Sequence, residues 1–217
     1  MDHAAARQNM VDCQILPNHV TNPSVVDGLL SLPREEFVTT DLMGVAYVDE
    51  ALPLGGGRYL MEPMVAARLL EEAQLQADDV VLCIGCGSGY LSALLAQIVS
   101  TVVSVESDKN LAARAGETFT RLDIDNVAVV DGALSDGHAK QGPYDAIVFD
   151  GAVGQVPDTI VEQLSEGGRL VAIVIGEDGI GRCRIITRHG GVVSGRDIFD
   201  AGAPMLPGFE RDTGFNF

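Results

Sequence analysis

The residues with the clearest chemical meaning in this sequence form a glycine-rich loop. An apolar run at 80–84 leads directly into Gly85, Gly87 and Gly89. Glycine lets a backbone turn tightly and approach a ligand that a Cβ atom would push away. A helix that follows such a loop points its first amide groups at that ligand. The loop therefore predicts a small-molecule site, with a plain strand-to-helix turn as the alternative.

A carboxylate stands where it would complete this site. Glu106 ends the next apolar run, about 20 residues after the first glycine, where an acidic residue accepts hydrogen bonds from both hydroxyls of a ribose. Tyr90 occupies the position at which a dinucleotide site needs a third small residue. The spacing therefore favours S-adenosylmethionine over NAD.

Asp131 and Gly132 follow the third apolar run, where such folds recognise an adenine amino group. An ordinary Asp-Gly turn is the alternative interpretation. The residues expected to contact the cofactor, or its product S-adenosylhomocysteine, are Gly85, Cys86, Gly87, Ser88, Gly89, Glu106, Asp131 and Gly132.

The elements that must position these residues alternate between strands and helices from residue 79 onward. Apolar runs typical of parallel strands covered on both faces lie at 80–84, 102–106, 127–130, 146–149 and 169–175. Helical patterns lie between them at 91–98, 110–122 and 158–164. This alternation predicts a doubly wound α/β fold with a mostly parallel sheet. Two more strands, 182–188 and 192–199, are expected to form an antiparallel hairpin at one sheet edge.

The chain before residue 63 has a different character. Helical patterns lie at 3–15 and 22–31, with Asn22 as the cap of the second, and another follows at 63–76. We therefore divide the chain into an N-terminal helical extension on the substrate side, 1–62, and an α/β domain, 63–217, that together form one structural unit. The apolar segment 203–209 is expected to lie across that domain.

Composition excludes several classes of protein. The 217 residues are 47% hydrophobic and 21% charged, as in a globular protein, and carry a formal net charge of −17. A surface this acidic repels phosphate backbones, so we expect no nucleic-acid partner. No apolar run reaches the ~18 residues that a membrane span requires, and the first residues lack the pattern of an export signal. We predict a cytoplasmic protein with no membrane contact.

Cys83 and Cys86 have the spacing of a redox or zinc pair. No second cysteine pair completes a zinc site and the histidines show no ligand spacing, so we expect no metal. A disulfide there would distort the glycine turn. Cys86 lies close to a helix N-terminus, where a thiol pKa can fall.

Beyond the glycine loop, the sequence resembles the protein-L-isoaspartate O-methyltransferase family, as a divergent member of bacterial type. The matching segments are 9–12, 32–38, 46–49, 52–55, 63, 65–66, 84–90, 131–132, 143–145, 156–157, 162–164 and 167–171. Many methyltransferases share the glycine motif, whereas 32–38 and 46–49 are far more specific. The resemblance implies a seven-stranded sheet whose last two strands are exchanged in order, and an S-adenosylmethionine cofactor. It also implies methyl transfer to the carboxylate of isoaspartyl residues in damaged proteins.

Two departures from the family pattern concern the substrate pocket and the cofactor. A family segment resembling Gln-Thr-Ile-Ser-x-Pro is replaced at 58–63, so that Tyr59 and Met61 stand in place of two hydroxyl residues that contact the substrate. Cys83 replaces an acid ahead of the glycine loop. Arg58 is expected to hold an acidic substrate group through its guanidinium; otherwise it caps a neighbouring helix or pairs with Glu62. Met61 can also be a plain core residue that fills the lost pocket.

Asp150, at the end of the fourth strand, faces the edge where open α/β sheets bind ligands, and a cap or turn aspartate is the alternative. With Leu54 and Gly55 it completes the expected substrate side. Three functions follow. The first is isoaspartyl carboxyl methylation of a protein or peptide. The second is methylation of another, small acidic acceptor by the same fold. The third is a non-catalytic descendant that binds a ligand or a partner.

Overall fold

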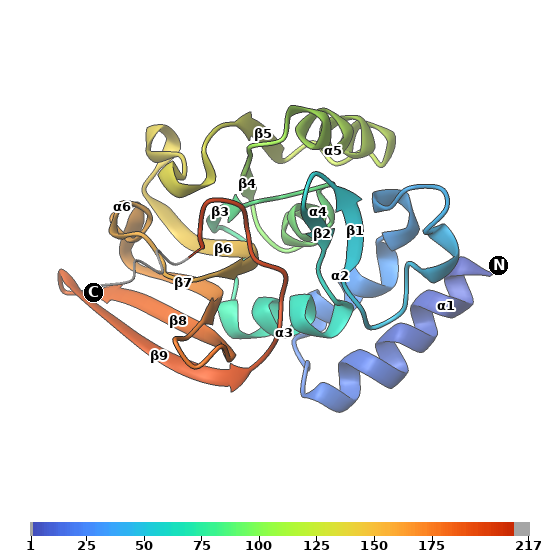
Figure 1. Ribbon diagram of the computed structural model, residues 1–217, viewed down its shortest axis with the longest axis horizontal. Coiled ribbons are helices and arrows are strands. Elements are labelled where there is room, and N and C mark those ends of the chain that lie inside the picture. The colour runs from blue at the N-terminus through green and yellow to red at the C-terminus, as the bar shows by residue number, and fades with distance from the viewer. Residues whose placement is uncertain (1, 211–217) are drawn as a thin grey trace, which may run out of the picture.

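A seven-stranded sheet organises the residues that the computed structural model describes, 2–210 (Figure 1). Its strand order is β5-β4-β3-β6-β7-β8-β9. The first five of these strands run parallel, and β8 and β9 pair antiparallel at the edge next to β7. The sheet ends with β7, β8 and β9 side by side in chain order. This arrangement of the last two strands, β8 and β9, is the exchange of order that the family resemblance implies. The strands are β3 (Val80–Ile84), β4 (Thr101–Glu106), β5 (Val127–Asp131), β6 (Tyr144–Val153), β7 (Leu164–Ile175), β8 (Gly181–His189) and β9 (Val192–Asp200).

Side chains alternate between the two faces of this sheet, as the pleat of a strand requires. In β3, Val81 and Cys83 join one buried cluster, and Leu82 and Ile84 join another. The first cluster lies under five helices: α1 (His3–Met10), α2 (Pro23–Ser31), α3 (Pro63–Ala73), α4 (Tyr90–Ala96) and α5 (Lys109–Arg121). The second lies under α6 (Asp158–Val161), a short turn at Leu134–Asp136 and the C-terminal segment 204–209.

The N-terminal segment packs into the first cluster rather than standing apart. Met10, Val11, Ile15 and Leu29 are all buried there. The expected helix at 3–15 ends at Met10 and continues as a π-helical turn, Val11–Ile15. Asn22 caps α2 as expected, because its side chain accepts a hydrogen bond from Ser24 N. The proposed boundary at residue 62 stays a prediction.

A short hairpin stands between these two regions. β1 (Leu52–Gly55) and β2 (Arg58–Leu60) pair antiparallel around Gly56 and Gly57, both with positive φ. The sequence pattern predicts only an interruption here, because three-residue β2 is too short to show a period. In β2 the side chains of Arg58 and Leu60 are buried and that of Tyr59 is exposed. The hairpin therefore aims Arg58 into the molecule.

The remaining boundaries differ from the sequence expectations at element ends. α3 ends at Ala73, because Gln74 adopts a left-handed conformation with φ 46°. β6 and β7 extend beyond the predicted runs, and α6 has only four residues.

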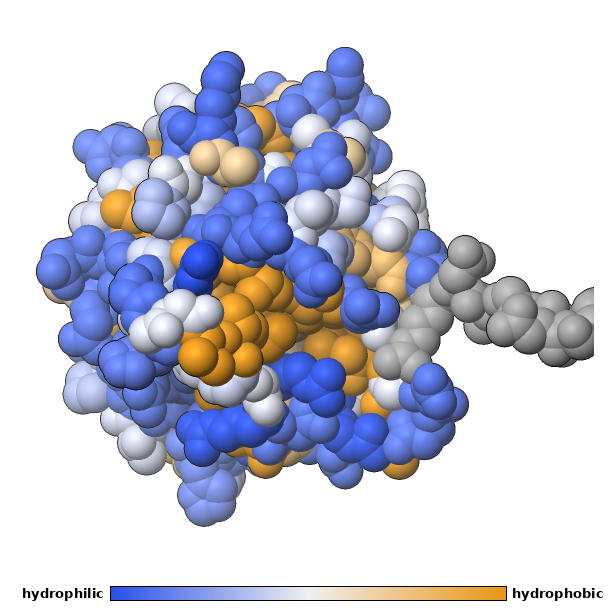
Figure 2. All heavy atoms as spheres, turned by 90° about the vertical axis from the view of Figure 1, so that its left-hand side faces the viewer, coloured by the Kyte–Doolittle hydropathy of each residue, from blue (hydrophilic) through white to orange (hydrophobic). Residues whose placement is uncertain are grey.

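Seen from the side of α6 and the β8–β9 turn, apolar side chains gather within a polar rim (Figure 2). Within residues 2–210, no helix is both long enough and apolar enough to cross a membrane.

Candidate cofactor crevice

The glycine loop needs its glycines. Gly85, Gly87 and Gly89 have φ of +80°, +54° and +98°, in the region that side chains rarely adopt. A Cβ atom on Gly89 would lie 2.6 Å from Phe119 Cζ, so the loop also lies too close to α5 for a side chain. The amides of Gly85 and Cys86 donate to Val105 O, which ties the loop to β4. α4 begins immediately after the loop, as the sequence predicts.

Glu106 is held under this loop at the end of β4. Its side chain is 0% exposed, and its carboxylate accepts hydrogen bonds from the amides of Gly87 (2.7 Å), Ser107 (2.8 Å) and Asp108 (3.0 Å). Amide donors compensate for the loss of water around a buried carboxylate. The predicted pair of glycine loop and acidic residue is therefore brought together.

Arg58 reaches the same carboxylate from the β1–β2 hairpin. Its Nη1 lies 2.7 Å and 2.8 Å from the two oxygens of Glu106, and its Nη2 donates to Gly85 O at 2.5 Å. Only 3% of Arg58 is exposed. Both alternatives considered from the sequence are wrong, because Arg58 neither caps a helix nor pairs with Glu62. It forms a buried ion pair with the residue expected to hold the ribose.

The C-terminal segment closes the crevice from above. Leaving β9, it turns in front of β6 (Figure 1), where Met205 forms a parallel bridge with Ala152. Pro204 O accepts a hydrogen bond from Ala152 N, and Leu206 N donates to Ala152 O, both at 2.8 Å. The Leu206 side chain lies over Gly85 and Gly151, since a Cβ on either glycine would come within 2.7 Å of Leu206 Cδ2. The prediction that this segment lies across the domain is confirmed.

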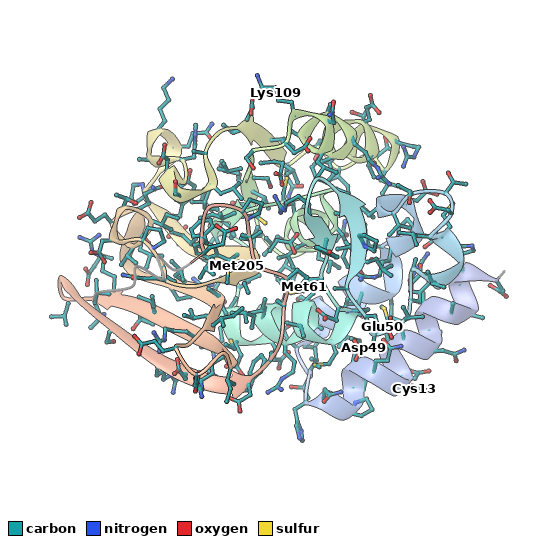
Figure 3. The ribbon with its side chains drawn as sticks, in the orientation of Figure 1. Cys13, Asp49, Glu50, Met61, Lys109 and Met205 are labelled. Carbon is teal, nitrogen blue, oxygen red and sulfur yellow. The ribbon has the colours of Figure 1, made fainter. Side chains whose placement is uncertain are left out.

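Little space remains between these groups. A cavity of about 10 Å³ is lined by Gly57, Arg58, Tyr59, Met61, Asp150, Gly151, Pro204, Met205 and Leu206. That volume admits at most about one water molecule. Met61 and Met205, which both line this cavity, are labelled in neighbouring parts of the view in Figure 3. The structure thus brings Arg58, Tyr59, Met61 and Asp150 to one place, with Tyr59 40% exposed at the rim.

Asp150 is a strand residue rather than a cap or a turn. It lies in β6 where the pairing with β7 is irregular, between Val148 and Ala152, and only 5% of it is exposed. Irregular pairing of this kind re-aims a side chain, here into the cavity. Burial raises the pKa of Asp150 to about 7; the positive charges of Arg58 and Arg34 oppose this rise and the charge of Glu106 adds to it.

This raised pKa predicts a pH-dependent stability. Between pH 4 and 7 the unfolded chain loses the Asp150 proton while the folded chain keeps it, so folding loses free energy as the pH rises. Relative to Asp150→Asn, wild type should lose about 2–4 kcal/mol of unfolding free energy between pH 4 and 8. Urea unfolding at several pH values measures this difference.

Asp178→Asn is the matched control, because the pKa of Asp178 is lowered in the folded protein whereas that of Asp150 is raised. Hydrogen bonds from Arg182 lower the pKa of exposed Asp178 to about 2, so its contribution is present above pH 4 and is lost only in strong acid. A wild-type curve parallel to that of Asp150→Asn from pH 4 to 8 would contradict the burial of an uncharged Asp150.

A buried arginine, Arg34, fixes the backbone next to the cavity. Arg34 donates from Nε to Ala46 O (2.7 Å) and from Nη2 to Met61 O (2.6 Å), which fixes the backbone beside the cavity. Its guanidinium lies 4.7 Å from the ring centroid of Tyr90. Tyr90 is buried against Phe37 and does not enter the crevice. Arg34 lies in the family-specific segment 32–38, which was the only sequence signal for it.

The other predicted site residues lie around this centre. Leu54 is buried against Gly87, and Gly55 is exposed in the hairpin. Asp131 is exposed and lies 3.4 Å from Lys109 Nζ, and Gly132 N donates to Glu106 O. Ser88 is buried with its hydroxyl unpartnered.

Cys83 in β3 and Cys86 in the glycine loop do not behave as a reactive pair. Burial raises the pKa of both thiols, so the expectation of a lowered pKa at Cys86 is wrong. Both thiols are free. No cluster of three potential metal ligands occurs among residues 2–210.

Comparison with known proteins supports the resemblance drawn from the sequence. The model of the family described as Protein-L-isoaspartate(D-aspartate) O-methyltransferase (PCMT) matches residues 5–198. The protein-L-isoaspartate O-methyltransferase of Methanoculleus marisnigri is 37% identical over 186 residues, which are 86% of this chain and 84% of that protein.

Two solved structures have the same fold. A protein-L-isoaspartate O-methyltransferase superposes with a TM-score of 0.82 and 26% identity, covering 93% of this chain and 66% of that one. A Plasmodium falciparum protein in complex with S-adenosyl-L-homocysteine superposes with a TM-score of 0.79 and 21% identity, covering 95% and 98% of the two chains. The predictions of fold class and enzyme class are confirmed at the level of the family.

Proposed function

Because the chain belongs to the protein-L-isoaspartate O-methyltransferase family, we propose that it binds S-adenosylmethionine over Gly85–Gly89 and methylates isoaspartyl carboxylates of proteins or peptides. The observation that carries the proposal is the buried Glu106 carboxylate beneath a loop of three left-handed glycines. The proposal includes a cytoplasmic location and a substrate that is neither a nucleic acid nor a membrane component.

The groups of the crevice fit such a cofactor. The carboxylate of Glu106 is fixed by three backbone amides, and withdrawal of Arg58 would free an acceptor position on it for the ribose hydroxyls. Gly85 O is a second acceptor at the same edge of the sheet. Cys83 contributes no charge, because burial raises its thiol pKa. When bound, the cofactor supplies an electrophilic methyl group on a sulfonium.

The work left to the protein is positioning and exclusion of water. An acceptor carboxylate has a pKa near 4 and is ionised at neutral pH, so no general base is needed. Alignment of the two reactants in a dry site supplies most of the catalysis. Met61, Met205 and Leu206 give this part of the crevice an apolar lining. Among residues 2–210, Arg58 is the one cation that lines the cavity, and its guanidinium suits a carboxylate.

A second function is favoured by one observation. Tyr59 is 40% exposed at the rim and Met61 is buried without a hydroxyl, so neither position offers the small buried hydroxyl of a serine or threonine. A methyltransferase that acts on a different, small acidic acceptor would need no hydroxyl there.

Transfer of labelled methyl to an isoaspartyl peptide and to its aspartyl twin separates these functions. We expect labelling of the isoaspartyl peptide alone, and about a tenfold higher rate for Tyr59→Thr with Met61→Ser, since a buried hydrogen bond to a charged group contributes about 1.5–3 kcal/mol. Met10→Ser, equally buried but remote from the crevice, is the control and should not raise the rate. Cofactor binding without labelling of either peptide would favour the second function, and no cofactor binding would leave only a non-catalytic descendant.

A further inference from the structure

The crevice is filled by the chain itself. Arg58 takes the hydrogen bonds of Glu106 and Gly85, and Leu206 covers Gly85 and Gly151. Building on the proposed function, we propose that Arg58 and Leu206 act as an internal ligand that competes with the cofactor, and that Arg58 passes from Glu106 to Asp150 when the cofactor binds.

The hydrogen bonds of Glu106 leave its carboxylate no free acceptor position. A carboxylate offers about four lone-pair positions. Glu106 already accepts from the amides of Gly87, Ser107 and Asp108, and Arg58 Nη1 contacts both of its oxygens. No position is left for two ribose hydroxyls. Because the other donors are backbone amides of the glycine loop and of the turn after β4, Arg58 is the donor that can leave.

The space over Gly85 is occupied by side chains of the protein. A ligand can lie against Gly85 only where no other atom does, and Leu206 Cδ2 and Arg58 Nη2 would lie 2.7 Å and 2.9 Å from a Cβ placed there. Among residues 2–210, the Leu206 segment is bonded to β6 by two backbone hydrogen bonds to Ala152 and one from Gly154 N to Phe209 O, and Phe209 makes an edge-to-face contact with Phe149. Leu206 and Phe209 are also buried in the second cluster. A segment joined to the sheet by these few hydrogen bonds opens at lower free energy than the sheet beneath it.

Arg58 needs another carboxylate partner when it leaves Glu106. A buried guanidinium that loses its carboxylate is strongly destabilised unless another takes over. In the described part of the chain, Asp150 is the one carboxylate that lines the cavity with Arg58. Its charge is otherwise opposed by burial and by Glu106, and favoured by Arg34. Arrival of Arg58 would therefore ionise Asp150 and release its proton. The thiols of Cys83 and Cys86 also lie near Asp150, but burial keeps them protonated.

Calorimetric titration with S-adenosylhomocysteine tests the competition. Leu206→Ala should bind it about 10-fold more tightly than wild type, because the buried leucine no longer has to be expelled. Leu164→Ala, in the same apolar cluster and equally buried at the start of β7, should bind it like wild type. Equal affinities of wild type and Leu206→Ala would overturn the inference.

Titrations of wild type at pH 7 in two buffers of different ionisation enthalpy test the transfer of Arg58. We expect release of about half a proton per bound ligand, because a group with a pKa near 7 is half protonated at that pH. Asp150→Asn should release none. Binding without proton release would refute the transfer to Asp150.

Hydrogen exchange of the wild-type chain keeps the inference testable if Leu206→Ala fails to fold. The amides of Ala152 and Leu206 are bonded across the bridge, so they should exchange faster when S-adenosylhomocysteine is bound. Slower or unchanged exchange with the ligand bound would contradict displacement of the segment. Absence of binding by wild type and both leucine variants would instead refute the proposed function, and this inference with it.

Discussion

Glu106→Gln is expected to lower the free energy of unfolding by about 3–5 kcal/mol, because it leaves the buried Arg58 guanidinium without a counter-charge. The NH2 group of the glutamine also turns donor hydrogens either toward the backbone amide of Gly87 or toward those of Ser107 and Asp108, and these amides need acceptors. Urea unfolding of the two proteins measures the difference. Glutamine at this position should also weaken binding of S-adenosylhomocysteine.

An exposed ion pair of similar geometry is the control. Glu36 Oε2 lies 2.8 Å from Arg121 Nη2, but both side chains face solvent, so Glu36→Gln should change stability by about 1 kcal/mol or less. Arg58→Met should destabilise less than Glu106→Gln, because three backbone amides still hold the remaining carboxylate. Equal losses for Glu106→Gln and Glu36→Gln would show that the buried pair does not organise the crevice.

Gly89→Ala is expected to destabilise the protein by about 2–5 kcal/mol, from backbone strain and overpacking together. The backbone has φ +98°, and the new Cβ would meet Phe119 Cζ at 2.6 Å and Ala115 Cβ at 3.1 Å. Ala115 Cβ is fixed to the backbone of α5, and the Phe119 ring is buried, so α5 has to give way. Thermal and urea unfolding report the loss.

Gly116→Ala, which makes the same substitution within α5, is the control. Among residues 2–210, no side chain and no backbone outside α5 lies within 4 Å of a Cβ built there. Alanine in a helix is favoured over glycine by about 1 kcal/mol, so this variant should be at least as stable as wild type. If the two variants were equally stable, the close approach of the glycine loop to α5 would be wrong.

Local sequence patterns were enough to predict the sheet. β3 has the predicted bounds because a strand buried on both faces is apolar throughout and stops where the glycines begin. The edge hairpin follows from Gly190 and Gly191, which both adopt positive φ in the turn. Glu106 was predicted from its distance to the glycine loop along the chain. Each of these features depends on neighbours in sequence.

The contents of the crevice depend on contacts between distant residues. Arg58 and Glu106 are 48 positions apart, and β2 is too short to show which way Arg58 points. Leu206 fits over Gly85 and Gly151 because neither has a side chain, but only the fold places the three together. The wrong expectation for Cys86 has the same origin: its position near a helix start favours a thiolate, whereas the surrounding core disfavours any charge.

A crystal structure of the protein grown with S-adenosylhomocysteine is the most direct test of the account. We predict the ribose hydroxyls within hydrogen-bond distance of Glu106, the nucleoside over Gly85–Gly89, and Leu206 withdrawn from the glycines. An intact bond between Arg58 and Glu106, with Leu206 still over Gly85 and no ligand in the crevice at saturating concentration, would contradict it.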